Sequence, residues 1–234
     1  YVANYASNNV TCIKRSDNTT TTIAVGTNPW AIWGDYSNVY TANYGANSVT
    51  CIKRSDNTVS TIAAGTYPSA IFGNETNVYI TNNGSDNVTV FTFVKVKSST
   101  IAAGTGPRPI WGDATHVYVA NYDSANVTCI KRSDGTTTAI STGNGPYSIW
   151  GDATNVYTAN TNSNNVTCIK RSDNTTTTIT TGTQPKYIWG DSTHVYTANW
   201  GSSNVTCIKR SDNTTTTIAS GSNPVNIWGD ATHV

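Results

Sequence analysis

Short segments that alternate β-branched or aromatic residues with polar ones recur along the whole chain. Between Pro185 and Gly221 four such segments follow one another, "YIWGD", "THVYTAN", "NVTCIKR" and "TTTTIAS", and Gly, Asp, Asn and Ser separate them. Segments of this length and composition, bounded by turn residues, are typical of β-strands. No window has the hydrophobic period of a helix. The pattern therefore predicts four short antiparallel strands in this stretch.

The four-strand pattern repeats at a fixed spacing. An Ile-Lys-Arg-Ser-Asp motif recurs at intervals of 39, 78, 39 and 39 along the chain, and it begins at Ile13, Ile52, Ile130, Ile169 and Ile208. Six units of the shorter interval account for the full length of the chain, and four strands in ~40 residues are typical of a β-propeller blade. We therefore expect an all-β fold, a six-bladed β-propeller with four antiparallel strands per blade, as a single domain over residues 1–234.

The two ends of the sequence predict how the ring closes. The chain opens with "YVAN" and ends with "ATHV", which together complete the strand written "HVYVAN" at residues 116–121. We expect the segment at 226–230, "NIWGD", to pair with the strand at Tyr1–Asn4 and to complete one blade from both termini. Such closure would remove the open sheet edge that a linear array leaves.

The strands differ in how well they suit water. The segments "AIW" and "VYVA" are apolar on both faces and predict inner strands that neighbouring blades cover. The Thr-rich run at Thr19–Thr22 predicts an outermost strand, since it is β-branched but polar enough to face solvent.

The cysteines occupy one position in each repeat, except in the third repeat, where Val90 replaces them. They are Cys12, Cys51, Cys129, Cys168 and Cys207. An odd number of cysteines cannot all pair within the chain. In addition, equivalent positions of a ring lie too far apart for disulfide geometry. We expect free thiols that fill the core.

Composition and charge exclude several partners. The net charge is +1 and charged residues make up 12% of the chain, against a usual ~25%. This balance provides no long-range field for nucleic acid or an acidic membrane. No apolar run is long enough to span a membrane, and no signal-peptide pattern occurs. Methionine is absent, which favours a processed, trimmed or engineered product, and we expect a monomer.

Several motifs resemble a known repeat family. The stretches "VYVANYDSANVTCI" and "GNGPYSIWGDAT" are similar to the YVTN-type β-propeller repeat, a relative of the NHL-type propellers. The resemblance covers all six units and departs from the family at "GDATH", where the family usually has a proline. It implies a propeller and suggests an extracellular or cell-surface location. It leaves the activity open, because one fold hosts many functions.

Sequence variation between the six repeats is concentrated at one end of the blades. In an up-and-down blade, the loop before the first strand and the loop after the second share one end, and both vary. The Gly-Asp and Lys-Arg-Ser-Asp turns at the other end hardly change. We predict a ligand-binding face at the variable end, formed by Trp30, Tyr67, Ser69, Arg108, Tyr147, Lys186, Tyr187, Val225, Asn226, Trp200 and Asp123. Neutral drift combined with tight turn constraints is the alternative explanation.

The chemistry of the variable end favours a glycan or a protein surface as the ligand. It is nearly neutral and carries aromatic residues among Asn, Ser and Gly, a mixture typical of adaptable binding surfaces and of rings that stack on sugars. The alternative is that individual rings pack within the fold, and Tyr5, Tyr44 and Tyr122 are the foremost candidates for packing. The Lys-Arg pairs at the other end are expected to be solvated hairpins, with a weak anion-binding crown as the alternative.

No asymmetric cluster indicates catalysis. His116, His194 and His233 occupy one turn position in different repeats, too far apart to share an ion. The only glutamate, Glu75, belongs to a turn, and the Gly-Asp aspartates recur in nearly every repeat. We therefore expect a non-enzymatic protein with no catalytic residue, no metal and no cofactor. Two alternatives stay open: an engineered or reconstructed repeat scaffold with no selected ligand, and a channel-mouth hydrolase or lyase.

Overall fold

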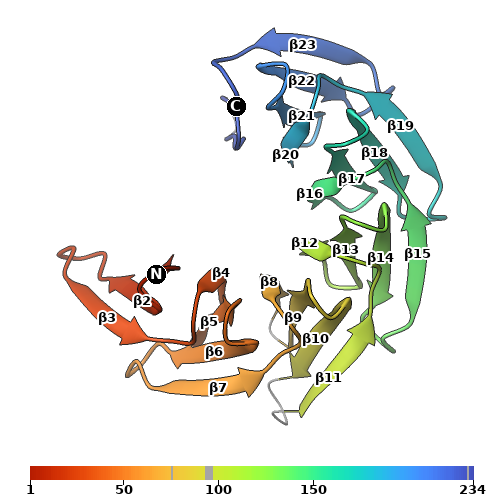
Figure 1. Ribbon diagram of the computed structural model, residues 1–234. Helices are drawn as coiled ribbons and strands as arrows, with labels where there is room; N and C mark the ends of the chain where they lie inside the picture. The colour runs from red at the N-terminus through yellow and green to blue at the C-terminus, as the bar shows by residue number, and fades with distance from the viewer. Residues whose placement is uncertain (75, 93–96, 231) are drawn as a thin grey trace. The chain divides into compact units, whose positions relative to one another are not determined.

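The computed structural model describes residues 1–74, 76–92, 97–230 and 232–234, so Glu75 lies outside the described residues. The described residues form β-strands and turns without a helix, which confirms the all-β class (Figure 1). No helix that could cross a membrane is therefore found in this part of the chain. The chain divides into two compact units, residues 1–110 and residues 111–234.

Unit 1 contains one three-stranded sheet followed by two four-stranded sheets, all antiparallel, with strands adjacent in chain order. The first sheet consists of β1 (Val2–Asn4), β2 (Asn9–Ile13) and β3 (Thr20–Ala24). The second consists of β4 (Pro29–Gly34), β5 (Asn38–Asn43), β6 (Ser48–Lys53) and β7 (Val59–Ala63). The third consists of β8 (Pro68–Gly73), β9 (Asn77–Asn82), β10 (Asn87–Thr92) and β11 (Lys97–Ala102).

Unit 2 contains sheets of the same four-stranded design. The first consists of β12 (Pro107–Gly112), which contains the boundary between the units, β13 (His116–Asn121), β14 (Asn126–Lys131) and β15 (Thr137–Ser141). The next consists of β16 (Pro146–Gly151), β17 (Asn155–Asn160), β18 (Asn165–Lys170) and β19 (Thr176–Thr180). The last consists of β20 (Pro185–Gly190), β21 (His194–Asn199), β22 (Asn204–Lys209) and β23 (Thr215–Ala219).

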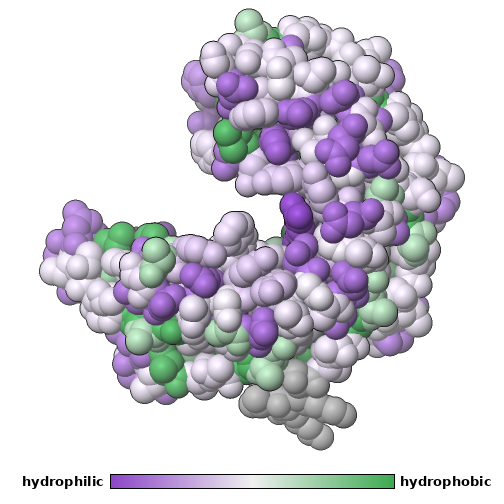
Figure 2. Space-filling view, viewed as in Figure 1, coloured by the Kyte–Doolittle hydropathy of each residue, from purple (hydrophilic) through white to green (hydrophobic). Residues whose placement is uncertain are grey.

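The burial of each strand follows its composition. The second and third strands of the four-stranded sheets are the most buried, and Tyr40, Tyr118 and Tyr157 are among the largest fully enclosed side chains. The outermost strands β3, β15 and β19 are exposed except for Ile23, Ile140 and Ile179, which confirms the expectation for the Thr-rich run in β3. Most of the surface seen in Figure 2 is neither strongly hydrophilic nor strongly hydrophobic, in keeping with this composition.

A buried asparagine ends each second strand and fixes the loop beside it. In the β16–β19 sheet, Asn160 Nδ2 donates to Asn165 Oδ1 and to Thr167 Oγ1, both at 2.8 Å. The Thr167 hydroxyl in turn accepts the backbone N–H of Gly143 at 3.2 Å. A Cβ on Gly143 would lie 2.5 Å from Asn165 Oδ1 and 2.9 Å from Asn160 Nδ2, so a larger residue would displace the side chains of this network. The network satisfies polar groups that the core would otherwise leave unpaired.

Neighbouring sheets pack through a tryptophan and a glycine of successive first strands. A Cβ on Gly190 would lie 2.7 Å from the Trp150 ring, and one on Gly151 would lie 2.9 Å from the Trp111 ring. The indole therefore lies where the next first strand has no side chain, which lets two sheets approach closely. Such face-to-face stacking of short antiparallel sheets is consistent with the blades of a propeller.

All five cysteines are free, as expected. Cys129 and Cys168 are buried, whereas Cys12, Cys51 and Cys207 are half-buried. Burial raises the pKa of the Cys129 and Cys168 thiols, which makes them inert fillers of the core.

The first sheet differs from the expected blade. It has three strands, because β1 occupies the second position of the blade and residues 226–230 form no strand in this structure. Closure of the ring by these residues stays a prediction.

Candidate functional site

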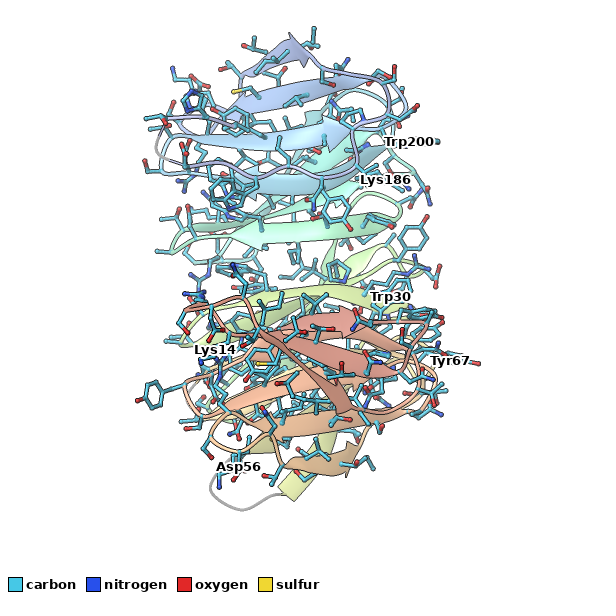
Figure 3. All side chains as sticks on the ribbon, turned by 90° about the vertical axis from the view of Figure 1, so that its left-hand side faces the viewer. Lys14, Trp30, Asp56, Tyr67, Lys186 and Trp200 are labelled. Carbon is cyan, nitrogen blue, oxygen red and sulfur yellow. The ribbon has the colours of Figure 1, made fainter. Side chains whose placement is uncertain are left out.

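The loops at the two ends of each blade carry different side chains. In unit 1, Trp30 and Tyr67 lie at one end and Lys14 and Asp56 at the other (Figure 3). This arrangement follows from the up-and-down order of the strands, since alternate connections in an antiparallel sheet lie at the same end. We call the end with Trp30 and Tyr67, and the equivalent end of the unit 2 blades, the variable face.

In four of the described sheets, a bulge places the residue after the repeated proline. In the pairing of β4 with β5, Pro29 faces Asn43 and Ala31 faces Ala42, so Trp30 is the extra residue of the strand. The same shift places Ser69, Tyr147 and Lys186. A β-bulge bends the strand and redirects one side chain, and bulges are frequent beside binding sites. The most variable position of the repeat is therefore one that the backbone sets apart from the sheet.

The residue before each proline has a left-handed backbone. These residues are Asn28, Tyr67, Gly106, Gly145, Gln184 and Asn223, with φ between 51° and 67°. The loop of the preceding sheet holds most of them in place: the Gln184 N–H donates to Asn164 Oδ1 at 2.8 Å, and the Tyr67 N–H donates to Asn47 Oδ1 at 3.0 Å. The backbone of the variable face is thus uniform while its side chains differ.

In unit 1 the variable face carries a continuous row of aromatic rings, which we call the unit 1 row. The Trp30 ring lies 5.5 Å from Tyr5, edge to face, and 5.8 Å from Tyr44, whose ring stacks on Tyr67 at 4.8 Å. These contacts rigidify the row, as expected for the packing role of Tyr5 and Tyr44. Trp30 nevertheless remains 61% exposed. The row combines fixed geometry with an open indole face.

In unit 2 the variable face combines rings with a cation. The Lys186 Nζ lies 4.5 Å from the centroid of the Tyr147 ring and 5.9 Å from that of Trp200. Tyr187 and Tyr122 approach Tyr147 edge to face, at 6.0 and 6.2 Å. Burial, with a smaller contribution from Tyr147, raises the pKa of Tyr187. Lys186, Tyr147, Tyr187 and Trp200, here called the lysine patch, lie together as one cluster of contacting side chains.

The other sequence-predicted residues have different surroundings. The Ser69 hydroxyl lies 3.1 Å from Thr81 Oγ1 and donates to the Pro107 carbonyl at 3.3 Å, which ties it into the fold. The carbonyl of the half-buried Arg108 accepts the Thr81 hydroxyl at 2.9 Å. Asp123, Val225 and Asn226 are exposed. Within each unit the structure therefore groups the aromatic residues and Lys186, while Ser69 is held by its hydrogen bonds.

The end opposite the variable face has a structural reason for its uniformity. The Lys residues lie solvated beside hairpin aspartates, as in the pair Lys53–Asp56 at 3.1 Å. The Thr58 hydroxyl, the Thr58 backbone N–H and Lys53 together lower the pKa of Asp56 to about 2. The arginines behave differently, since the Arg171 side chain is 11% exposed and pairs with Asp113 of the preceding sheet, with Trp111 beside it. Arg210 pairs in the same way with Asp152 of the preceding sheet. The expectation that both members of each Lys-Arg pair are solvated is wrong for these arginines, because they connect adjacent sheets.

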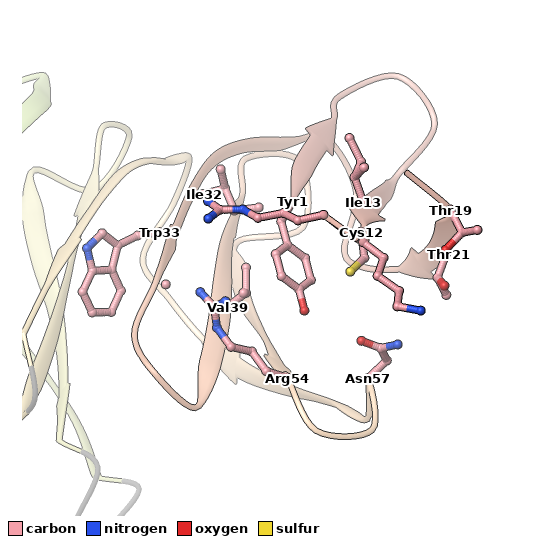
Figure 4. Close-up of a pocket in the computed structure, with 13 residues that line it drawn as sticks. Tyr1, Cys12, Ile13, Thr19, Thr21, Ile32, Trp33, Val39, Arg54 and Asn57 are labelled. Atoms are coloured by element: carbon pink, nitrogen blue, oxygen red, sulfur yellow. The ribbon is translucent and has the colours of Figure 1, made fainter. Parts of the chain in front are cut away.

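A hollow of about 800 Å³ opens at the hairpin end of unit 1, where sequence reasoning placed no site. Figure 4 shows the Tyr1 ring between Cys12 and Arg54, and Ile32 and Trp33 also line the hollow. The Arg54 guanidinium lies 5.4 Å from the centroid of the Tyr1 ring. Burial raises the pKa of Tyr1, with Cys12 adding to this effect and Arg54 opposing it. The only signal in the sequence is the incomplete first repeat.

Potential metal ligands are scattered. Within the described ranges, no three His, Cys, Asp or Glu side chains lie close enough to hold an ion together. His116 and His194 instead begin strands, and their backbone N–H groups donate to the turn residues Asp113 and Asp191 at 2.9 and 2.8 Å. The two histidines were expected in the turns; each is instead the first residue of the strand that follows the turn.

Comparison with known proteins identifies the fold alone. No protein-family model and no curated protein sequence matches the chain. Virginiamycin B lyase from Staphylococcus aureus matches with a TM-score of 0.70 and 16% identity, over 85% of this chain and 73% of that chain. A functionally unknown protein from Desulfotomaculum acetoxidans matches with a TM-score of 0.74 and 16% identity, over 96% and 80%. A chain of a nidogen/laminin complex matches with a TM-score of 0.61 and 12% identity, over 91% and 90%.

These likenesses support a β-propeller repeat fold, whereas the YVTN type stays a prediction. A hydrazine synthase and putative 6-phosphogluconolactonases are also similar in fold. Several of the similar proteins are thus enzymes, and the fold is compatible with catalysis as well as with binding.

Proposed function

We propose that this chain is a non-enzymatic binding propeller whose variable face recognises a carbohydrate. The unit 1 row carries this proposal, because Trp30 is 61% exposed although the Tyr5 and Tyr44 rings contact it, and Tyr44 in turn stacks on Tyr67. An exposed indole that neighbouring rings hold in place offers a flat, rigid surface at a low cost in conformational entropy. The apolar C–H face of a sugar ring fits such a surface.

Three features of the backbone support a binding role. The bulge sets the residue after the proline apart from the ladder, and the left-handed residue before it fixes the loop. The side chains at the position after the proline differ in all six repeats, while the bulge itself recurs in four of the described sheets. Loops of fixed geometry with variable side chains on a rigid scaffold are typical of binding surfaces.

A protein surface is the alternative ligand, and the fold similarity to a chain of the nidogen/laminin complex favours it. Hydrolase or lyase activity is a further candidate because of the similarity in fold to virginiamycin B lyase. At 16% identity this similarity concerns the fold, so residues of that enzyme are not transferred to this chain. A metal-dependent hydrolytic or lyase activity in a broad substrate screen would favour the enzyme.

A glycan array tests the carbohydrate proposal with two matched variants of the same sheet. Trp30→Ala removes the exposed indole, whereas Tyr36→Ala removes a 98% exposed ring from the turn at the opposite end. We expect the full chain to bind a defined group of glycans, Trp30→Ala to weaken that binding about tenfold, and Tyr36→Ala to leave it unchanged. A further variant with Trp30, Tyr147, Lys186 and Tyr187 all changed to Ala should lose binding. If the wild-type chain binds no glycan, or Trp30→Ala binds as well as wild type, the carbohydrate assignment is wrong and a protein ligand or a scaffold without a ligand is favoured.

We also propose that residues 226–230 supply the missing strand of the first sheet and close the ring. Trp150 covers Gly190 and Trp189 covers Gly229, so each indole covers the Trp-Gly glycine of the next repeat. In a closed ring, the first repeat follows the last one, so Trp228 would cover Gly34 in the same way.

The described neighbours of Gly34 differ from those of the equivalent glycines. The atoms nearest to a Cβ on Gly34 belong to Arg54, Asn38 and Val39, and none of them is an indole atom. Trp228 is 72% exposed. Among the described residues, Gly34 thus differs from the equivalent glycines, which an indole covers, and the Trp228 indole is largely exposed.

The arginines support the same assignment. Arg171 lies beside Trp111 and pairs with Asp113, which belong to the Trp-Gly-Asp sequence of the preceding repeat. Arg210 has the same two contacts, with Trp150 and Asp152. For Arg54, the equivalent residues across a closed ring are Trp228 and Asp230.

The hollow already contains part of this arrangement. Arg54 lies over the Tyr1 ring, as Arg171 lies over Tyr118. A segment with the sequence Ile-Trp-Gly-Asp would therefore complete the contacts of the hollow.

A further inference from the structure

The lysine patch contains an ammonium group that contacts two rings and that has no carboxylate partner among the described residues. The ion pairs of the described residues connect hairpin lysines, Arg171, Arg210 and His233 with nearby aspartates, and none of them includes Lys186. Lys186 is half-buried, with its Nζ 4.5 Å from the centroid of Tyr147 and 5.9 Å from that of Trp200. The negative faces of the two rings hold the cation, but they leave its N–H groups available as donors.

The unit 1 row provides a contrast within the same chain. Its four rings have three described ring contacts with one another, and no described cation–π contact involves them. The two parts of the variable face therefore differ in charge. The unit 1 row fits a neutral apolar surface, whereas the lysine patch adds a fixed positive charge beside a ring, Trp200, that is 39% exposed.

Charge in the surroundings decides which ligands the patch accepts. The exposed Asp123 follows Tyr122, whose ring lies 6.2 Å from that of Tyr147, and no described ion pair joins Asp123 to Lys186. On the side of Trp200, the Asn223 Nδ2 donates to the Trp200 carbonyl at 2.9 Å, which holds the loop without adding charge. An anionic group beside Trp200 could therefore pair with the Lys186 ammonium without displacing a described carboxylate partner.

We propose that the lysine patch binds a sugar that carries an anionic substituent, a carboxylate or a sulfate. The sugar ring stacks on the exposed Trp200 indole, and the Lys186 ammonium donates charge-assisted hydrogen bonds to the substituent. A lysine ammonium is a compact point charge, so it can donate hydrogen bonds to either a planar carboxylate or a tetrahedral sulfate. The inference rests on the proposed carbohydrate function and adds the class of sugar.

The competing explanation is that Lys186 only stabilises the loop through its contacts with the rings. An exposed cation–π contact stabilises a fold by about 0.5–1 kcal/mol. That role would change thermal stability and would leave ligand preference untouched. The test therefore compares matched ligands on one protein as well as protein variants on one ligand.

The experiment uses the full chain and pairs of oligosaccharides that differ in one group. One pair ends in glucose or glucuronate, and the other ends in galactose or galactose 6-sulfate. The variants are Lys186→Met, which keeps the apolar stem against the rings, and Lys186→Arg, which keeps the charge. Lys170→Met is the matched control, because Lys170 lies on an exposed hairpin beside Asp173. Affinity is measured by calorimetry at low and at high salt, and circular dichroism checks folding.

We expect wild type, Lys170→Met and Lys186→Arg to prefer the anionic member of at least one pair by about tenfold at low salt, with a smaller preference at high salt. Lys186→Met should bind both members of that pair equally, with the affinity that wild type has for the neutral one. The two pairs distinguish carboxylate from sulfate. Equal binding of both members by wild type, or a preserved preference in Lys186→Met, would overturn this inference and leave the carbohydrate function standing. Absence of binding to any glycan would overturn both.

Discussion

Tyr67 and Gln184 have a backbone conformation that residues with large side chains rarely adopt, at φ of 54° and 52°. The sequence contains a signal for this conformation at four of the six equivalent positions, because Asn28, Gly106, Gly145 and Asn223 are residue types that tolerate positive φ. The residue types Tyr67 and Gln184 do not themselves indicate a positive φ. Hydrogen bonds from the preceding loop impose the conformation, so tertiary contacts override the local preference. Strain of this kind is frequent at functional sites.

Replacing Gln184 tests whether the backbone is strained there. Asn is several-fold enriched at positive φ, which corresponds to about 1 kcal/mol, so Gln184→Asn should raise Tm by roughly 2–4 °C. Gln184→Thr is the opposite control, because a β-branched residue at this φ should lower Tm. Differential scanning calorimetry measures both. Equal Tm values for the two variants would mean that the residue is not strained in solution.

At the scale of elements, the alternation of residues and the turn residues between them predicted the strands well. The second strands are buried and the Thr-rich fourth strands are exposed, as expected from their composition. The bulge after the proline was not predictable, because the proline lies at the strand start and the extra residue has no fixed type. The contact of Arg171 with Asp113 was also missed, since it joins residues of different repeats and depends on how sheets stack.

The Arg171–Asp113 contact should make stability depend on acid. Burial raises the pKa of Asp113, but hydrogen bonds from the His116 and Thr115 N–H groups, the Thr115 hydroxyl and Arg171 outweigh it and lower this pKa to about 2. A lowered pKa in the folded state stabilises the fold above the unfolded pKa of roughly 3.9. The contribution disappears as the pH falls from about 4 to about 2.

We expect Asp113→Asn to lower the free energy of unfolding at pH 7 by about 1–2 kcal/mol, because it leaves a nearly buried guanidinium without its charged partner. The variant should also lose less stability than wild type between pH 4 and pH 2. Urea unfolding at pH 7, 4, 3 and 2 measures both effects. Asp123→Asn, at an exposed position, serves as the control and should follow wild type. If Asp113→Asn follows wild type at every pH, the contact between the sheets contributes nothing in solution.

At the scale of the whole molecule, the sequence predicted the number of repeats and the order of strands, because the repeat period is visible without any structure. In the sequence, the uniform Lys-Arg-Ser-Asp turns contrast with the loops of the variable face, and this contrast favours selection at that face. Part of that uniformity now has a structural cause in the arginines that join sheets. At the variable face the backbone is also constrained, but the side chains after the prolines differ from repeat to repeat.

A binding face shared by all six repeats requires that they form one ring, and hydrogen exchange at residues 227–229 tests this most directly. The equivalent residues of β20, Ile188–Gly190, are an internal reference because they lie in a complete sheet. We expect the amides of Ile227, Trp228 and Gly229 to be protected as strongly as those of the reference, in a sample shown to be monomeric by light scattering. Exchange of these amides at the rate of an unstructured peptide, with the reference strand still protected, would contradict closure.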